Sequence, residues 1–208
     1  MNDQRGGSSS RRGTVVYGDG AVEQLPQRIA TAGVDTVLLV CGRRSFEASG
    51  AARVVPDLEQ VADVVRWSDF SPNTDVDDLR RGLAVLHGAN ADMVIGVGGG
   101  SAMDMAKLLC AFEAVGDASD LCLTDAIRSG RSIDARRPGM VLVPTTSGSG
   151  SEATHFAVVY IGQDKYSVAG AVLRPDLAIL DPELTLSGSS YQRATSGIDA
   201  VAQAVESL

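Results

Sequence analysis

The sequence contains few of the residues that most often bind transition metals. Its 208 residues include two histidines, His87 and His155, and three cysteines, Cys41, Cys110 and Cys122. The cysteines lack the spacing of a metal site and stand in apolar surroundings, which is typical of reduced thiols in a cytosolic protein. His87 stands near the end of an amphipathic segment, where a histidine commonly closes a helix. We therefore expect a cytoplasmic protein in which the cysteines bind no metal.

The chain also lacks an excess of positive charge and any long apolar run. Its formal net charge is −8 at pH 7, which argues against nucleic acid or an anionic membrane as a partner. No segment approaches the roughly 18 apolar residues of a membrane span, and residues 1–13 lack the apolar stretch of a signal peptide. Because residues 1–13 are mostly Gly, Ser and Arg, we predict a disordered tail there.

Lysine is scarce as well, since Lys107 and Lys165 stand beside 16 arginines. A compact ammonium group fits pockets that a planar guanidinium does not, so a retained lysine suggests a role that arginine cannot fill. We expect Lys107 to pack against or cap its own helix.

After the tail, short apolar runs alternate with amphipathic segments. This alternation predicts an α/β fold with a mostly parallel sheet covered by helices on both faces. Between residues 115 and 137 the periodicity fails, and we expect a mobile connection there. Strands are expected at 14–17, 36–41, 61–67, 91–97 and 140–143, and helices at 21–32, between 41 and 61, and at 75–87, 102–109 and 191–208.

Two glycine-rich turns follow apolar runs. The first is Gly98-Gly99-Gly100-Ser101, and the second extends from Thr145 to Glu152 after a strand that Pro144 ends. Glycine lets the backbone approach a ligand closely, and the first N–H groups of the helix that follows favour a phosphate. An empty tight turn is the alternative for either turn alone. Two such turns on one parallel sheet predict a phosphate-binding edge.

Other glycine-loop chemistries do not fit these turns. A P-loop would need Gly-Lys-Ser/Thr at its end, but Lys107 follows alanine and Lys165 follows aspartate. A nucleophile elbow would need a glycine two residues before and after a serine, which Ser147, Ser149 and Ser151 lack. The GxGxxG spacing is also missing, so a dinucleotide site here would be of another type.

Four ordered motifs resemble the iron-containing (group III) alcohol dehydrogenases: residues 98–107, 144–154, 181–184 and 197–200. The resemblance extends over residues 14–208. It implies a dehydroquinate synthase-like, dinucleotide-binding α/β domain at 14–187 and, from 188 to 208, only the first helix of an all-helical metal and substrate domain. Members of the family are nearly twice as long, so we expect a truncated chain.

Residues 67–73 and 151–160 look like the phosphonoacetaldehyde reductase branch of that family. The resemblance implies reduction of a small aldehyde, here phosphonoacetaldehyde to 2-hydroxyethylphosphonate. A nicotinamide would deliver the hydride, and a divalent metal, Fe or Zn, would hold the aldehyde oxygen as a Lewis acid.

The resemblance implies a metal ligand at Asp199. Position 203 lies one helical turn further on the same face, and its residue, Gln203, is a weaker ligand than the family's histidine. The family's two later histidine ligands are absent, so metal binding should be weak or absent. With Asp199, the candidate catalytic residues are Lys165, on the nicotinamide side, and His155, beside the second turn.

The end of the second strand bears on the choice of cofactor. The family's usual aspartate, which binds the ribose hydroxyls of NAD, is replaced by Gly42, and two arginines, Arg43 and Arg44, follow, of which Arg43 is the expected contact. Small and cationic residues accommodate a 2′-phosphate, so we predict NADP(H) over NAD(H). A solvated pair of arginines is the alternative. The other expected cofactor contacts are Asn73, Gly98, Gly99, Gly100, Ser101, Asp104, Thr145, Thr146, Ser149, Thr154 and Lys165.

Two functions remain open for such a chain. It is an oxidoreductase if the helical domain is supplied by a second polypeptide or belongs to a part of the protein that is missing from this sequence. The other function is that of a non-catalytic, degenerate nucleotide-binding domain. A cyclase or lyase related to dehydroquinate synthase is disfavoured by motifs 181–184 and 197–200. The apolar stripe of Ile198, Val201, Ala202 and Val205 predicts self-association or a partner chain, and the first strand offers an edge for a homodimer.

Overall fold

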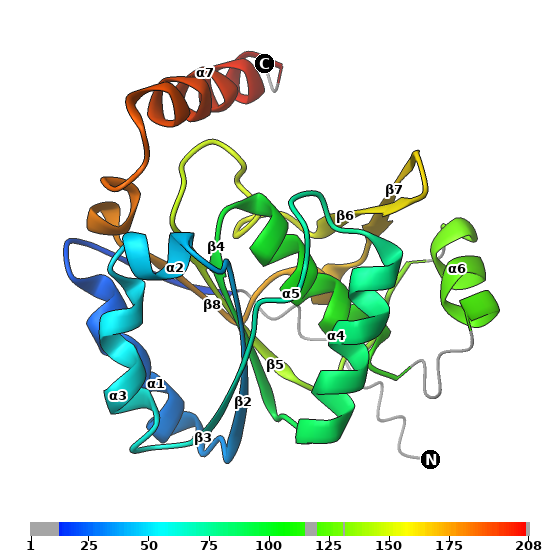
Figure 1. Ribbon diagram of the computed structural model, residues 1–208, viewed down its shortest axis with the longest axis horizontal. Helices are drawn as coiled ribbons and strands as arrows, with labels where there is room; N and C mark the ends of the chain where they lie inside the picture. The colour runs from blue at the N-terminus through cyan, green and yellow to red at the C-terminus, as the bar shows by residue number, and fades with distance from the viewer. Residues whose placement is uncertain (1–12, 115–119, 131, 207–208) are drawn as a thin grey trace, which may run out of the picture.

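A six-stranded, fully parallel sheet forms the centre of the computed structural model, which describes residues 13–114, 120–130 and 132–206 (Figure 1). The strand order is β1-β8-β5-β4-β2-β3, and every neighbouring pair is parallel. This confirms the α/β fold with a parallel sheet. The strands are β1 (Thr14–Tyr17), β2 (Thr36–Cys41), β3 (Asp63–Trp67), β4 (Met93–Gly98), β5 (Gly139–Pro144) and β8 (Leu177–Leu180).

Helices cover both faces of the sheet, and each face has its own core. Leu38 and Val40 of β2 belong to one buried cluster, whereas Val37 and Leu39 belong to the other. Because both faces are buried, the central strands read as continuous apolar runs. The first face carries α4 (Val76–Ala89), α5 (Gly100–Phe112) and α6 (Asp120–Arg128); the second carries η1 (Ala21–Gln24), α1 (Leu25–Ala32), α2 (Ser45–Ala48), η2 (Ala51–Val54) and α3 (Val55–Leu58).

A separate hairpin packs on the first face. Its strands β6 (Phe156–Ile161) and β7 (Asp164–Ala169) are antiparallel and form their own two-stranded sheet. The N–H of Tyr160 donates to the carbonyl of Thr74 at 2.8 Å, which ties the hairpin to the loop before α4. The remaining short helices are η3 (Ala171–Leu173) and η4 (Pro182–Thr185).

The last helix, α7 (Ser190–Glu206), stands away from the sheet beyond the second glycine turn (Figure 1). None of its residues is buried. Ile198, Val201 and Val205 are each at least 63% exposed, so no residue that the structure describes covers the predicted apolar stripe.

The connection predicted at 115–137 is wrong over the described residues. Residues 120–128 form α6, and its Leu123 and Ile127, one turn apart, are buried against the core. Arg136 forms an ion pair with Asp176 at 2.8 Å, which anchors the segment after the helix. The sequence pattern missed α6 because tertiary burial of two side chains stabilises it.

Other expected boundaries shift by a few residues. The strand predicted at 61–67 begins at Asp63, and the helix predicted at 21–32 divides into η1 and α1. Residues 1–12 of the expected tail and 115–119 of the expected connection lie outside the described residues. Within the described ranges, no helix combines the length and the apolar content that crossing a membrane requires.

Candidate functional site

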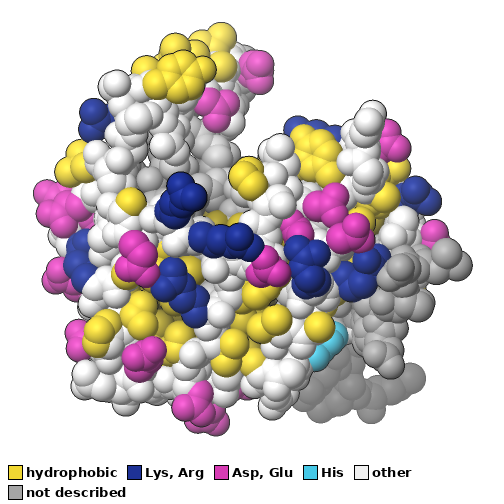
Figure 2. All heavy atoms as spheres, viewed as in Figure 1, with side chains coloured by type: hydrophobic (Ala, Val, Ile, Leu, Met, Phe, Trp, Pro, Cys, Tyr) yellow, Lys and Arg dark blue, Asp and Glu magenta, His cyan; other side chains and the backbone are white. Residues whose placement is uncertain are grey.

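A groove runs along the carboxyl edge of the parallel sheet, where β2, β4 and β5 end. Its volume is about 760 Å³. Figure 2 shows Lys and Arg side chains gathered across this face, below the hollow beside α7. The groove is lined by Gly42, Arg43, Arg44, Ser45, Phe70, Ser71, Pro72, Gly99, Gly100, Ser101, Ala102, Thr145, Thr146, Gln192 and Ser196.

The first glycine turn places the start of α5 at the groove. Gly98 has a φ of 154°, and a Cβ built on it would lie 2.7 Å from the Cβ of Ala102, so no side chain fits there. Gly99 is the N-cap of α5, and its backbone is extended. The first N–H groups of the helix have no helical acceptor and favour a phosphate.

The second glycine turn lies directly against the first. The N–H of Thr145 donates to the carbonyl of Gly98 at 2.9 Å. A Cβ built on Gly99 would lie 3.1 Å from Thr146 Oγ1, and one on Gly100 would lie 3.2 Å from Ser149 Cβ. The two turns therefore form one continuous backbone surface, as the sequence predicted for a phosphate-binding edge.

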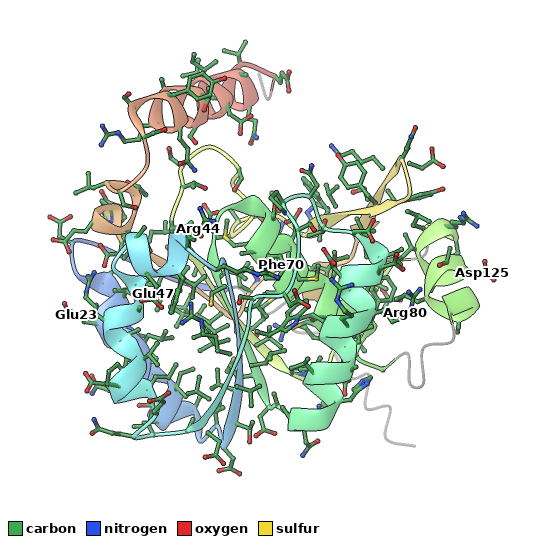
Figure 3. All side chains as sticks on the ribbon, viewed as in Figure 1. Glu23, Arg44, Glu47, Phe70, Arg80 and Asp125 are labelled. Atoms are coloured by element: carbon green, nitrogen blue, oxygen red, sulfur yellow. The ribbon has the colours of Figure 1, made fainter. Side chains whose placement is uncertain are left out.

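The two arginines after β2 have different surroundings. Arg43 donates through Nη2 to Asp69 Oδ1 and through Nε to the carbonyl of Ser68 at 3.1 Å. Arg44 lines the groove and forms no ion pair with another described residue. Figure 3 labels Arg44 beside α2 and Phe70 near the middle of the view. The sequence offered both arginines, with Arg43 as the expected contact, whereas Arg44 is the one whose guanidinium forms no ion pair with a described residue.

Of the residues expected near the nicotinamide, only some lie close to the start of α5 and the groove. Asn73, with a φ of 67°, donates its N–H to Ser101 Oγ at 3.2 Å, so it lies beside the start of α5. Thr154 is tied to Lys107 rather than turned freely toward the groove. His155 and Lys165 are exposed on or beside the hairpin and are not among the residues that line the groove.

Asp104 and Lys107 of α5 form hydrogen bonds with the end of the second glycine turn and the segment that follows it. Asp104 accepts from Ser151 Oγ at 2.5 Å and from the N–H of Val158 at 3.0 Å. Both carboxylate oxygens are thus used within the protein, although the sequence suggested a cofactor contact. Burial lowers the pKa of Lys107 to about 8, while the charges of Asp104 and Glu152 act in the opposite direction.

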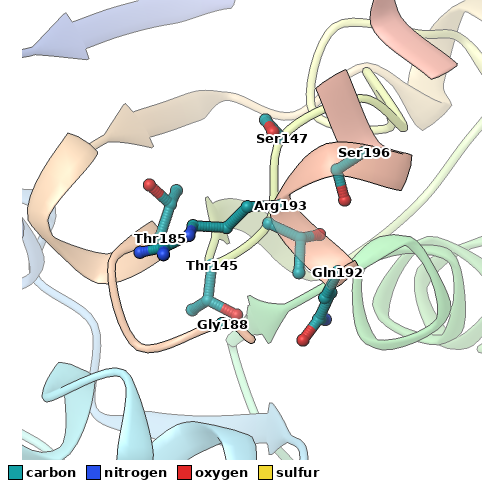
Figure 4. Close-up of a pocket in the computed structure, with 8 residues that line it drawn as sticks. Thr145, Ser147, Thr185, Gly188, Gln192, Arg193 and Ser196 are labelled. Carbon is teal, nitrogen blue, oxygen red and sulfur yellow. The ribbon is translucent and has the colours of Figure 1, made fainter. Parts of the chain in front are cut away.

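A smaller pocket opens between the second turn and α7, with a volume of about 130 Å³ (Figure 4). The guanidinium of Arg193 lies beside Thr185 there and donates to the carbonyl of Leu186 at 3.1 Å. Sequence reasoning did not point to this pocket, because its parts come from three separate segments. It is lined by Thr145, Thr146, Ser147, Thr185, Gly188, Gln192, Arg193 and Ser196.

Asp199 and Gln203 share one face of α7, as the four-residue spacing predicted. Gln203 Nε2 donates to Asp199 Oδ1 at 3.5 Å. A Cβ built on Gly148 would lie 3.2 Å from Asp199 Oδ2, and one on Gly150 would lie 3.8 Å from Gln203 Oε1. These oxygens suit two positions around a hard cation. They do not complete a site, since the described residues contain no group of three His, Cys, Asp or Glu that could hold a metal.

Comparison with known proteins shows which family the chain resembles. The sequence profile of the iron-containing alcohol dehydrogenases matches residues 13–182. Over 195 residues the chain is 32% identical to choline dehydrogenase of Bacillus subtilis, covering 92% of this chain and 48% of that protein. Long-chain-alcohol dehydrogenase 1 of Geobacillus thermodenitrificans is 34% identical over 190 residues, with 91% and 48% covered.

Solved structures agree with the sequence relatives. Sulfoacetaldehyde reductase from Bifidobacterium kashiwanohense, in complex with NAD⁺, superposes with a TM-score of 0.84 at 26% identity, covering 93% of this chain and 51% of that chain. NADH-dependent butanol dehydrogenase A of Thermotoga maritima gives a TM-score of 0.83 at 27% identity, with 93% and 48% covered. The chain spans about half the length of these relatives. By sequence profile and fold, this chain belongs to the iron-containing alcohol dehydrogenase family.

Proposed function

We propose that this chain binds NADP(H) in the groove and serves, in the assembled enzyme, the reduction of a small aldehyde to an alcohol. One observation carries the proposal: two glycine turns meet at the carboxyl edge of a parallel sheet, joined by the hydrogen bond from Thr145 to Gly98. Such an edge presents N–H groups to a pyrophosphate. Membership of the iron-containing alcohol dehydrogenases supports the reaction class.

The groove gives the dinucleotide a direction. The adenosine end would lie at Gly42 and Arg44, and the pyrophosphate at the start of α5. By the family resemblance, the nicotinamide would lie toward Thr154 and toward Asn73, whose N–H donates to Ser101 at the start of α5, although neither residue lines the groove. Gly42 presents no carboxylate to repel a 2′-phosphate, and Arg44 offers a cation that no other described residue pairs with. These features support a preference for NADP(H) over NAD(H).

A reduced nicotinamide bound there would supply a hydride to the carbonyl carbon of the aldehyde, and a proton from solvent would go to the carbonyl oxygen to give the primary alcohol. The chain's own contribution is to bind and orient that cofactor. His155 and Lys165 of the hairpin remain candidates for contacts to substrate, although they lie outside the groove lining. As the substrate we propose phosphonoacetaldehyde. A related structure is a sulfoacetaldehyde reductase, whose named substrate is likewise a two-carbon aldehyde with an anionic oxyacid group.

The metal centre would need more ligands than the described residues provide. Asp199 and Gln203 would contribute two oxygen ligands, and a second polypeptide that supplies the helical domain would contribute the rest. The exposed apolar stripe on α7, at Ile198, Val201 and Val205, supports such a partner.

The alternative is a nucleotide-binding domain without catalysis. The two-ligand set at Asp199 and Gln203 favours it, since such a set binds a divalent ion weakly. In this case the groove would bind cofactor, but no aldehyde would be reduced under any metal condition.

Calorimetric titration of the chain with NADPH and NADH tests the proposal, followed by addition of Fe(II) or Zn(II) and phosphonoacetaldehyde. The site variant is Gly99→Ala, whose new methyl would lie 3.1 Å from Thr146 Oγ1 on an extended backbone. The control is Gly88→Ala, where no atom lies within 4 Å of a built Cβ. We expect NADPH to bind to the parent and to Gly88→Ala, and more weakly to Gly99→Ala. Absence of cofactor binding by the parent would refute the proposal, and binding without turnover would favour the alternative.

A further inference from the structure

Lys107 is a fully buried lysine whose ammonium group is surrounded by oxygen atoms. It lies on α5, and its Nζ donates to the carbonyl of Thr154 at 3.0 Å, to Thr154 Oγ1 at 2.9 Å and to the carbonyl of Phe156 at 2.9 Å. An ammonium group has three donors and no acceptor, so these three oxygens satisfy it completely. A planar guanidinium cannot converge on three oxygens in this way, which gives a physical reason for a lysine in so arginine-rich a chain.

Asp104 adds further hydrogen bonds between α5 and the segment that Lys107 contacts. It precedes Lys107 by three residues, so both side chains lie on one face of α5. Asp104 holds Ser151 and Val158, and Lys107 holds Thr154 and Phe156. The segment from 151 to 158 is therefore fixed to α5 at both ends and in the middle.

The same helix begins at the first glycine turn. Because α5 starts at Gly100 and carries Lys107 two turns later, the attachment fixes the segment after the second turn relative to the pyrophosphate position. Thr154 has its hydroxyl oxygen engaged by Lys107, and its own proton is directed to the carbonyl of Ser151, at 3.3 Å, or of Phe156, at 3.4 Å. The rotamer of Thr154 thus depends on Lys107.

We propose that Lys107 is a positioning residue for the nicotinamide end of the cofactor, acting by holding Thr154 and the 151–158 segment. The inference rests on the proposed function, because it requires a dinucleotide in the groove. Removing the ammonium leaves two carbonyls and a hydroxyl without their buried donor, so the segment must move to find other donors. The adenosine end, at Gly42 and Arg44, lies on the far side of the glycine turn and should not respond.

The test compares two probes that share the adenosine end. NADPH carries the nicotinamide, whereas adenosine 2′,5′-bisphosphate does not. Both are titrated into the parent chain, Lys107→Met, Lys107→Gln and a stability control, Ile29→Val. Ile29 is buried in the cluster on the opposite face of the sheet. The fluorescence of bound NADPH is recorded as a direct signal from the nicotinamide.

For Lys107→Met we expect the Kd of NADPH to rise about tenfold while the Kd of the bisphosphate stays within about twofold of the parent. Lys107→Gln keeps an N–H donor and should lose less, and it carries the test if the methionine variant does not fold. Ile29→Val should leave both constants unchanged. Equal affinity losses for both probes, or unchanged NADPH affinity and fluorescence, would overturn the role of Lys107. If the parent binds neither probe, the proposed function itself fails.

Discussion

Replacing Arg44 should change the choice between the two nicotinamide cofactors. Arg44 lines the groove next to Gly42 and forms no ion pair with another described residue, so its guanidinium is available to a 2′-phosphate. Hydrogen bonds to a charged group contribute roughly 1.5–3 kcal/mol, and each 1.4 kcal/mol corresponds to about tenfold in affinity. Arg44→Gln should therefore weaken NADPH binding by about 10- to 100-fold.

NADH lacks the 2′-phosphate, so its affinity should stay nearly constant in Arg44→Gln. The matched control is Arg43→Gln. Arg43 is already paired with Asp69 and with the carbonyl of Ser68, so its loss should alter NADPH affinity much less. Isothermal titration of both cofactors into the parent and both variants gives the ratio of dissociation constants directly.

Raising the salt concentration adds an independent check. A guanidinium–phosphate contact at an exposed groove is screened by salt, so the NADPH preference of the parent should shrink as ionic strength rises. Parallel losses of NADPH and NADH affinity in Arg44→Gln would refute the assignment of Arg44 to the 2′-phosphate. A larger effect in Arg43→Gln than in Arg44→Gln would refute the reasoning from the Asp69 ion pair.

Four further predictions concern stability and association. Gly98→Ala should lower the free energy of unfolding by roughly 1–3 kcal/mol in urea denaturation, because of its positive φ and the Ala102 contact. Relative to Lys107→Met, the parent should gain stability from pH 8 to about 10.4, because the unfolded lysine keeps its proton longer. Burial raises the pKa of Cys110 to about 12, so the parent should lose stability relative to Cys110→Ala above pH 9.0, where the unfolded thiol ionises first. Val201→Lys should reduce self-association in size-exclusion chromatography, and an unchanged elution volume would count against association through α7.

The parts of the fold that depend on short-range patterns were predictable from sequence. β4 and β5 are apolar runs buried on both faces, and the glycine turn after β4 has a local signature, so both could be read without a structure. The start of α4 also has a local signal, because Asp75 stands just before the helix and accepts from the N–H of Asp77 at 2.8 Å as its N-cap. Thr74, one residue earlier, donates its hydroxyl to the carbonyl of Val158 in the hairpin.

The parts that depend on distant contacts were not predictable. Whether Arg43 or Arg44 is available is decided by Asp69, which lies 26 residues from Arg43. The helix α6 is stabilised by burial of Leu123 and Ile127 against the core. The local sequence does not indicate that these two side chains are buried. Asp104 reaches Ser151 and Val158, 47 and 54 residues away, so no local pattern distinguishes it from a ligand contact.

The cofactor groove and the candidate metal ligands on α7 differ in the packing that fixes them in place. The glycine turns are fixed by the buried sheet and by α5, so cofactor binding depends on packing that the chain already contains. Asp199 and Gln203 stand on α7, a helix of 17 residues with none buried. Most helical stability in proteins comes from packing an apolar face, and α7 leaves its apolar face exposed. We therefore expect residues 13–206 to bind the cofactor without help, and metal affinity to rise when a partner or a further part of the protein covers Ile198, Val201 and Val205 and fixes the direction of Asp199.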